Sequence, residues 1–222
     1  ATILFGNGSS WRTMITTAGS AEYFAISGVD AFMAFAVGTN GSIAVWNGVS
    51  WAPVGGGLTL AFSPNTTASG TRLATHNDGS GQRLFVFGSF NQAGGVAASG
   101  VARWSGSAWS AAGSLPGPTS STFDAAISTA SGLYVKRSPA VGGISIYRWN
   151  GSVWEGIASP GGANAVLAGT DGGPNGKLYA TTQEPNGFGN HDRLPGKTGF
   201  RVNDPGTKRI AIAQLATQET AC

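Results

Sequence analysis

The chain has 222 residues, of which 36 are Gly and 7 are Trp, and only 10% of them are charged. A hydrophobic fraction of 41% excludes intrinsic disorder, and a net charge of +3 without a basic run argues against nucleic acid as a partner. Short apolar runs between Gly-rich turns predict an all-β protein in which helix is nearly absent.

In chain order, we expect two leading strands and then four repeat units of four strands, the strand number of a propeller blade. The leading strands are Thr2–Phe5 and Ser10–Ile15. The first two complete units contain Ala21–Ile26, Phe32–Val37, Ser42–Trp46 and Ser50–Val54, then Thr71–Thr75, Leu84–Phe87, Gly100–Trp104 and Ala108–Ala112. The last two contain Phe123–Ser128, Leu133–Lys136, Ile144–Trp149 and Val153–Ile157, then Ala165–Ala168, Lys177–Thr181, Thr198–Val202 and Lys208–Ala213.

These strands predict a single propeller-like domain over residues 1–222, with repeat units at roughly 1–18 (partial), 19–58, 59–115, 116–160 and 161–222. Four whole units and a partial one favour five blades, one of them split between the ends of the chain. The residues after the last expected strand, 214–222, are too few for two more strands. A ring of four blades with an extra hairpin, or pairing with other copies of the chain, therefore stays open.

All seven Trp residues lie in one recurring hairpin. It contains the pairs Trp46 and Trp51, Trp104 and Trp109, and Trp149 and Trp154, and a partial copy ends at Trp11. Asn-Gly at positions 47 and 48 predicts a type I′ turn, which places Trp46 opposite Val49 and makes Trp46 and Trp51 diagonal neighbours. Because side chains alternate along a strand, both Trp of each copy should share one face.

The run from Leu84 to Trp104, with its Ala-Arg-Trp ending and the hairpin that follows, resembles the kelch-like propeller repeats of bacterial surface proteins and fungal cortical polarity markers. The likeness is strongest in the second unit and weakest after residue 160. The resemblance implies a β-propeller fold. It implies little about function, because propellers include enzymes, lectins and scaffolds.

The three Trp pairs (Trp46, Trp51, Trp104, Trp109, Trp149 and Trp154) are the candidate ligand-binding residues, since indole rings stack on the C–H faces of sugars. Packing between neighbouring blades is the favoured interpretation, because Trp buries a large area and the pairs recur in every unit. We expect a non-enzymatic recognition or structural module on a cell or virion surface. Its expected partners are glycans or other protein copies, and a homo-oligomer stays open; neither nucleic acid binding nor membrane insertion is expected.

The alternative function is a polysaccharide-acting hydrolase or lyase with its site in a central channel, where Asp30 and Asp124 are the acids best placed at strand starts. His76 and His191 lie in polar loop sequences without a nucleophile elbow, so neither a catalytic triad nor a metal site is expected. No cofactor is expected.

Asp78 and Asp171 lie in Gly-rich turns that are explained by ordinary turn chemistry rather than by calcium. Cys222, the single cysteine, is expected to be an unpaired tail residue. Residues 1–5 lack the basic and apolar regions of a signal peptide, and an extracellular or surface-exposed location is expected from the composition.

Overall fold

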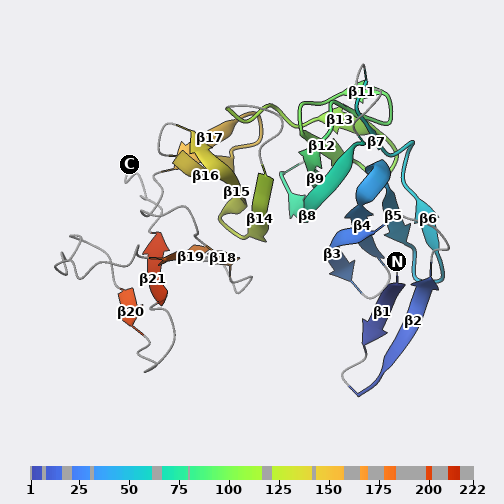
Figure 1. Ribbon diagram of the computed structural model, residues 1–222, viewed down its shortest axis with the longest axis horizontal. Coiled ribbons are helices and arrows are strands. Elements are labelled where there is room, and N and C mark those ends of the chain that lie inside the picture. Colours follow the sequence, from blue (N-terminus) through green and yellow to red (C-terminus); the bar gives the residue numbers. More distant parts are fainter. Residues whose placement is uncertain are drawn as a thin grey trace. The chain divides into compact units, whose positions relative to one another are not determined.

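The computed structural model describes residues 2–6, 9–16, 22–30, 33–61, 67–79, 81–116, 122–141, 144–157, 166–169, 178–183, 199–201 and 210–215. The chain forms two compact units (Figure 1). The first unit comprises Ala1–Phe123 with Gly151–Trp154, and the second comprises Asp124–Asn150 with Glu155–Cys222. The described residues are all-β: they contain strands and one 3₁₀ turn, Thr39–Gly41, but no α-helix. The described residues contain no helix with the length and apolar character needed to cross a membrane.

Four antiparallel sheets have four strands each. The first sheet contains β3 (Tyr23–Asp30), β4 (Met33–Gly38), β5 (Ile43–Trp46) and β6 (Trp51–Pro53) in chain order. The second contains β8 (Ser69–Asn77), β9 (Gln82–Ser89), β12 (Val101–Trp104) and β13 (Trp109–Ala111). The third contains β14 (Thr122–Thr129), β15 (Gly132–Val141), β16 (Ile144–Trp149) and β17 (Trp154–Ile157). These twelve strands confirm the three complete units expected from the sequence, with ends shifted by a few residues.

The fourth sheet differs in strand order. It contains β18 (Val166–Gly169), β19 (Leu178–Gln183), β20 (Gly199–Arg201) and β21 (Ile210–Leu215) in the order β18-β19-β21-β20. The two leading strands are also present, as the hairpin of β1 (Thr2–Gly6) and β2 (Trp11–Thr16). The sequence therefore predicted the strands of the divergent unit, but not the order in which they pair.

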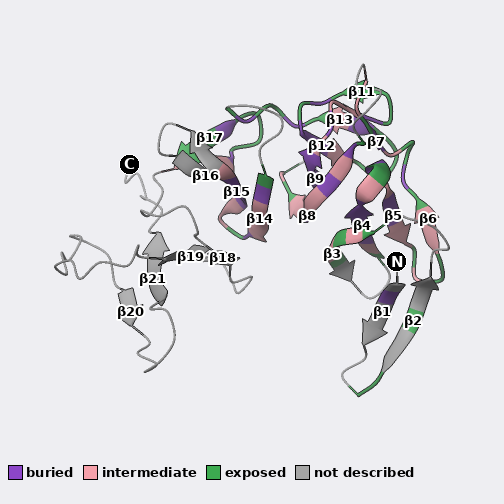
Figure 2. Cartoon of the chain, in the orientation of Figure 1, coloured by how far each residue is buried: buried purple, intermediate pink, exposed green. Residues whose placement is uncertain are grey.

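The core of the first compact unit lies between the first and second sheets, where β8 runs alongside β3 and β4 (Figures 1 and 2). Alternation along each strand points one set of apolar side chains toward this core. The first sheet contributes Phe35, Val37 and Ile43, and the second contributes Leu73, Leu84 and Val86, all of them buried. Each such side chain stabilises the fold by about 1.5–3 kcal/mol through removal from water. In the second compact unit, Tyr134 and Ile146 are buried together against Ala125, Ile127 and Ile157.

The Trp hairpins turn differently from the expectation. Trp46 pairs directly with Trp51, and Trp104 with Trp109, across loops of four residues. The predicted type I′ turn is wrong, because only Gly48, and not Asn47, has a positive φ. The Asn47 carboxamide oxygen instead accepts the N–H groups of Val49 and Ser50 at 3.0 and 2.8 Å, which closes a wider loop. The prediction that both Trp share one face is confirmed for these two hairpins, but their Trp residues are direct rather than diagonal neighbours.

A small three-stranded sheet was not predicted from the sequence. It consists of β7 (Leu58–Thr59), β10 (Gln92–Ala93) and β11 (Val96–Ala97). Its turn, Gly94-Gly95, has positive φ values of 55° and 81°, as a two-residue hairpin of the primed type requires. The Asn91 side chain fixes this hairpin to the chain after the first sheet, since it accepts from Ala61 N at 2.7 Å and donates to Ala61 O at 3.0 Å. The segment between the second and third strands of the second sheet therefore forms a hairpin with a defined position.

Candidate functional site

Each Trp pair lies on a defined face of its sheet. On the second sheet, the Trp104 and Trp109 ring centroids are 5.2 Å apart, and on the first sheet those of Trp46 and Trp51 are 6.0 Å apart. Residues paired directly across antiparallel strands point to the same side. The face that carries Trp104 and Trp109 also carries Leu84, which pairs with Trp104, and it looks toward the first sheet.

Trp109 is fixed against the chain that follows the first Trp hairpin. Its Nε1 donates a hydrogen bond of 2.9 Å to the carbonyl oxygen of Gly55, and only 7% of the residue is exposed. Gly55 and Gly94 pack against the two indole rings and form what is here called the Trp109 seat. A Cβ added at Gly55 would lie 2.6 Å from Trp104 Cζ3, and one added at Gly94 would lie 2.4 Å from Trp109 Cδ1. The high Gly content of the connections therefore has a packing reason: side chains would exclude the indole pair.

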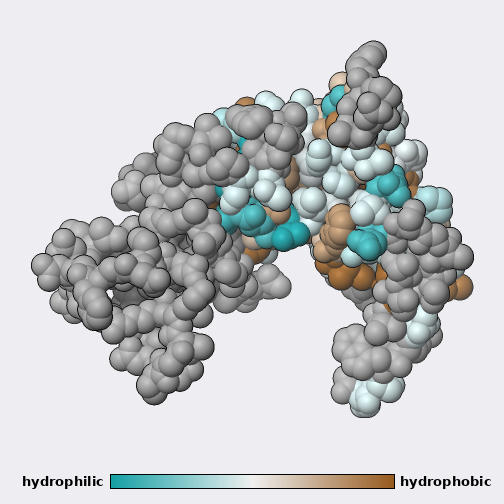
Figure 3. Space-filling view, viewed as in Figure 1, coloured by the Kyte–Doolittle hydropathy of each residue, from teal (hydrophilic) through white to brown (hydrophobic). Residues whose placement is uncertain are grey.

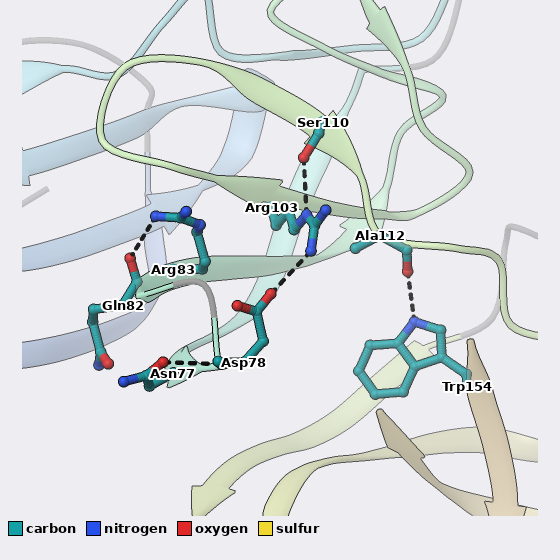
Figure 4. Close-up of polar contacts among 9 residues, drawn as sticks. Asn77, Asp78, Gln82, Arg83, Arg103, Ser110, Ala112 and Trp154 are labelled. Atoms are coloured by element: carbon teal, nitrogen blue, oxygen red, sulfur yellow. Dashed lines mark hydrogen bonds and ion pairs between the residues drawn. The ribbon is translucent and has the colours of Figure 1, made fainter. Parts of the chain in front are cut away.

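Trp154 repeats this contact one hairpin later (Figure 4). Its Nε1 donates a hydrogen bond of 2.7 Å to the carbonyl oxygen of Ala112, and its ring meets Phe87 edge-on with centroids 5.6 Å apart. Gly55 lies four residues after Trp51, and Ala112 lies three residues after Trp109. In both cases the second Trp of one hairpin binds the main chain just after the preceding hairpin. This recurrence supports packing as the role of Trp109 and Trp154.

Trp51, the equivalent residue of the first hairpin, has no such contact. Its Nε1 is buried and has no hydrogen-bond partner among the described residues. Beside it lies a cavity of about 420 Å³, whose lining includes Tyr23, Ser42, Ala44, Trp51, Pro53 and Gly57. An unpaired buried N–H costs about 1–3 kcal/mol relative to a paired one. The first sheet thus carries the donor of the repeated contact without its acceptor.

The face around Trp51, here called the open Trp face, is defined by the register of the first sheet. Ile26 pairs with Ala36, Ala36 with Ala44, Ala34 with Trp46, and Trp46 with Trp51. Ile26 is 58% exposed, Phe24 is 47% exposed, and both Trp rings are only half-buried. Figure 3 shows hydrophobic atoms gathered over β3, the strand of Ile26 and Phe24. Ala36 and Ala44, in the middle of this face, are buried, so its exposed apolar surface lies at Ile26 and Phe24. Exposed apolar side chains that gather in one place are typical of an interaction surface.

The candidate residues therefore divide into two groups. Trp109, Trp149 and Trp154 are buried, and Trp104 is half-buried against the core of the first compact unit. Trp46 and Trp51 form the pair that remains accessible beside a cavity. Sequence reasoning did not separate these pairs, and it did not single out Ile26 or Tyr23. The alternation of Ala25 and Ser27 with Ile26 was the available signal for two faces, but it does not tell which face is covered. A register shift between Tyr23 and Ala25 interrupts this alternation, so the position of Tyr23 beside the cavity could not be predicted from it.

A polar cluster that the sequence did not reveal lies in the second compact unit. Lys136 is 2% exposed, and its Nζ donates to the carboxylate of Asp124 and, at 3.3 Å, to Ser138 Oγ. Ser138 Oγ also donates to the same oxygen of Asp124 at 2.5 Å. Arg137, next to Lys136, is equally buried, and this burial lowers its pKa, with Tyr147 acting in the opposite direction. A buried cation must be paired, so Asp124 serves as the counter-ion of Lys136.

The second sheet holds one more ion pair (Figure 4). Arg103 Nη1 lies 2.9 Å from Asp78 Oδ2, and Arg103 Nε donates to Ser110 Oγ at 3.0 Å. Only 4% of the Asp78 side chain is exposed. Asp78 is thus a partner of the Arg in the Ala-Arg-Trp motif as well as a turn residue, which the turn-chemistry interpretation did not anticipate. His76, nearby on β8, meets Phe85 edge-on, and burial lowers its pKa while Asp78 acts to raise it.

Several residues weighed in the sequence lie outside the described residues: His191, Asp171 and Cys222, while for Asp30 only the backbone is described. Among the described residues, no group of three His, Cys, Asp or Glu side chains is placed to hold a metal ion. No protein-family model and no curated protein matches the sequence.

Proposed function

We propose that the chain is a non-enzymatic recognition or structural module, exposed on a cell or virion surface, that binds its partner through the open Trp face. The four-stranded sheets are, in this proposal, blades of a kelch-like propeller, five if the N-terminal hairpin counts as part of a blade. The running of β8 beside β3 and the recurrence of the Trp-to-carbonyl contact support that arrangement.

One observation carries the proposal: Trp51 stands beside a cavity with its N–H unpaired, on a face where Ile26 and Phe24 are exposed. A protein surface is the favoured partner class, because the equivalent donor on the second sheet binds a main-chain carbonyl and a Gly-rich connection. A glycan is the other class that indole rings bind by stacking. Location outside the cell follows from the low charge and the Gly- and Trp-rich repeat, and is proposed on that ground alone.

The contacts of Asp124 do not favour the polysaccharide-cleaving alternative. A general acid or nucleophile needs a carboxylate that can reach a substrate oxygen or carbon. The Asp124 carboxylate is instead held by Lys136 and Ser138. These contacts support a structural role for Asp124 in this proposal.

The test is to apply the full chain to a printed glycan array and to a sensor surface coated with the same chain. We expect binding in at least one format, lost in Ile26→Asp because the substitution buries a charge in the contact. Val49→Asp is the matched control, since Val49 is 82% exposed in the hairpin loop of the same sheet. Absence of binding in both formats, or equal binding by Ile26→Asp and Val49→Asp, would contradict the proposal.

A further inference from the structure

Two Trp contacts inside the first compact unit indicate which kind of segment packs on a face that carries a Trp pair. The indole N–H of Trp109 meets the Gly55 carbonyl, and that of Trp154 meets the Ala112 carbonyl. Both acceptors belong to the three or four residues that follow a hairpin with two Trp. A partner for the open Trp face should therefore present such a hairpin, with the carbonyl after it directed at Trp51 Nε1.

The chain contains three complete hairpins of this type, ending at Trp51, Trp109 and Trp154. The carbonyls after the first two are used by Trp109 and Trp154. The third hairpin is followed by Ile157, which lies three residues after Trp154 as Ala112 does after Trp109, and no Trp occurs later in the sequence. Among the described residues, Trp51 is thus the one second Trp of a complete hairpin whose N–H lacks the main-chain acceptor of the repeated contact, and the segment after Trp154 is an acceptor segment that no described Trp uses.

The N-terminal hairpin does not supply the missing acceptor. Met14 and Ile15 lie three and four residues after Trp11 and are among the described residues, yet Trp51 Nε1 has no partner there. No acceptor for this N–H is found among the described residues. We propose that the acceptor comes from a second copy of this chain, whose segment after Trp154 docks on the open Trp face and accepts the Trp51 N–H through the Ile157 carbonyl.

This proposal rests on the function proposed above and specifies its partner. The contact is heterologous, since the surface offered by one copy differs from the surface that receives it. Copies therefore add head to tail into a closed ring or an open filament. Ile26 and Phe24 would be buried on association, and the cavity beside Trp51 would be filled.

Sedimentation velocity of the full chain over a wide range of concentrations tests the proposal. We expect the weight-average sedimentation coefficient to rise with concentration. Ile26→Asp should weaken association on the order of tenfold or more, because it places a charge in the contact. Trp51→Phe, which keeps an aromatic ring but loses the N–H, should weaken it by roughly three- to tenfold. Val49→Asp should associate like the unaltered chain.

A chain that stays monomeric at all concentrations would overturn the second-copy proposal, and so would association unaffected by Ile26→Asp. If such a monomer still binds a glycan on the array, and Ile26→Asp abolishes that binding, the recognition function stands and only the occupant is wrong. If it binds neither a glycan nor its own copies, both proposals fail. A monomer in which the Trp51 N–H is protected from exchange would show that the same chain covers its own face.

Discussion

The first and second sheets of this protein have equivalent faces that each carry a Trp pair. The face of the second sheet is packed against a neighbouring sheet, whereas that of the first sheet is partly exposed. In the second sheet, Leu73, Val86 and Ala102 lie in a row across the strands, with Trp104 and Trp109 at the outer edge, and this face is packed against the first sheet. In the first sheet, the same register aligns Ile26, Ala36 and Ala44 with Trp46 and Trp51. Leu73 is 6% exposed, whereas Ile26 is 58% exposed. The repeat thus builds the same contact surface whether or not a neighbour fills it.

The difference lies in the partner rather than in the Trp pair. Trp109 is held by a carbonyl and by two glycines that leave space for its ring, and these groups come from segments 54 and 15 residues earlier in the chain, around Gly55 and Gly94. Trp51 lies in an equivalent strand pair, but its N–H has no such acceptor among the described residues. The recurring Trp residues alone therefore do not fix whether a pair is core or surface.

The largest expected effect is a difference between the two Trp residues on truncation. Trp109→Ala should lower the free energy of unfolding by about 3–5 kcal/mol, because it removes a buried ring and leaves a cavity. Trp51→Ala should cost about 1 kcal/mol or less, since its ring is half-buried and its N–H has no partner to lose. Urea unfolding of both variants, followed by far-ultraviolet circular dichroism, provides the comparison. Similar losses in the two variants would mean that both faces are equally covered.

Much of this could be predicted from the sequence. The alternation of apolar residues and the Gly-rich turns identified the strands of all four sheets, and the spacing of the Trp residues correctly placed Trp46 with Trp51, and Trp104 with Trp109, on one face. Local signals of this kind are sufficient because they depend on residues close in sequence. The hairpin loop was mispredicted because the Asn47 side chain replaces a backbone hydrogen bond, a competition that the Asn-Gly pair alone does not reveal.

Long-range partners were beyond the reach of the sequence. Nothing in the run from Leu133 to Ser138 indicates that Lys136 is buried, because its counter-ion, Asp124, is on another strand. The seat of Trp109 likewise depends on Gly55, which is 54 residues away. The open state of Trp51 follows only from comparing its surroundings with those of Trp109 in three dimensions.

A smaller effect should separate two neighbouring glycines of the Trp109 seat. Gly94 and Gly95 both have positive φ, so Ala at either position carries a similar backbone strain of about 1 kcal/mol. A Cβ at Gly94 would also clash with Trp109, whereas one at Gly95 would have nothing within 4 Å. Gly94→Ala should therefore lower stability by about 1–3 kcal/mol more than Gly95→Ala in the same urea experiment. Equal effects would show that the Trp109 seat is not tightly packed.

The most direct test of the whole account is hydrogen exchange of the indole N–H groups, followed by NMR on the ¹⁵N-labelled full chain at low and at high protein concentration. Trp109 and Trp154 donate to main-chain carbonyls within one compact unit, so their N–H groups should be protected at both concentrations. The Trp51 N–H should exchange faster than these two in dilute protein, and should gain protection as copies associate. Protection of Trp51 equal to that of Trp109 in dilute, monomeric protein would contradict the account, because the open Trp face would then already be filled.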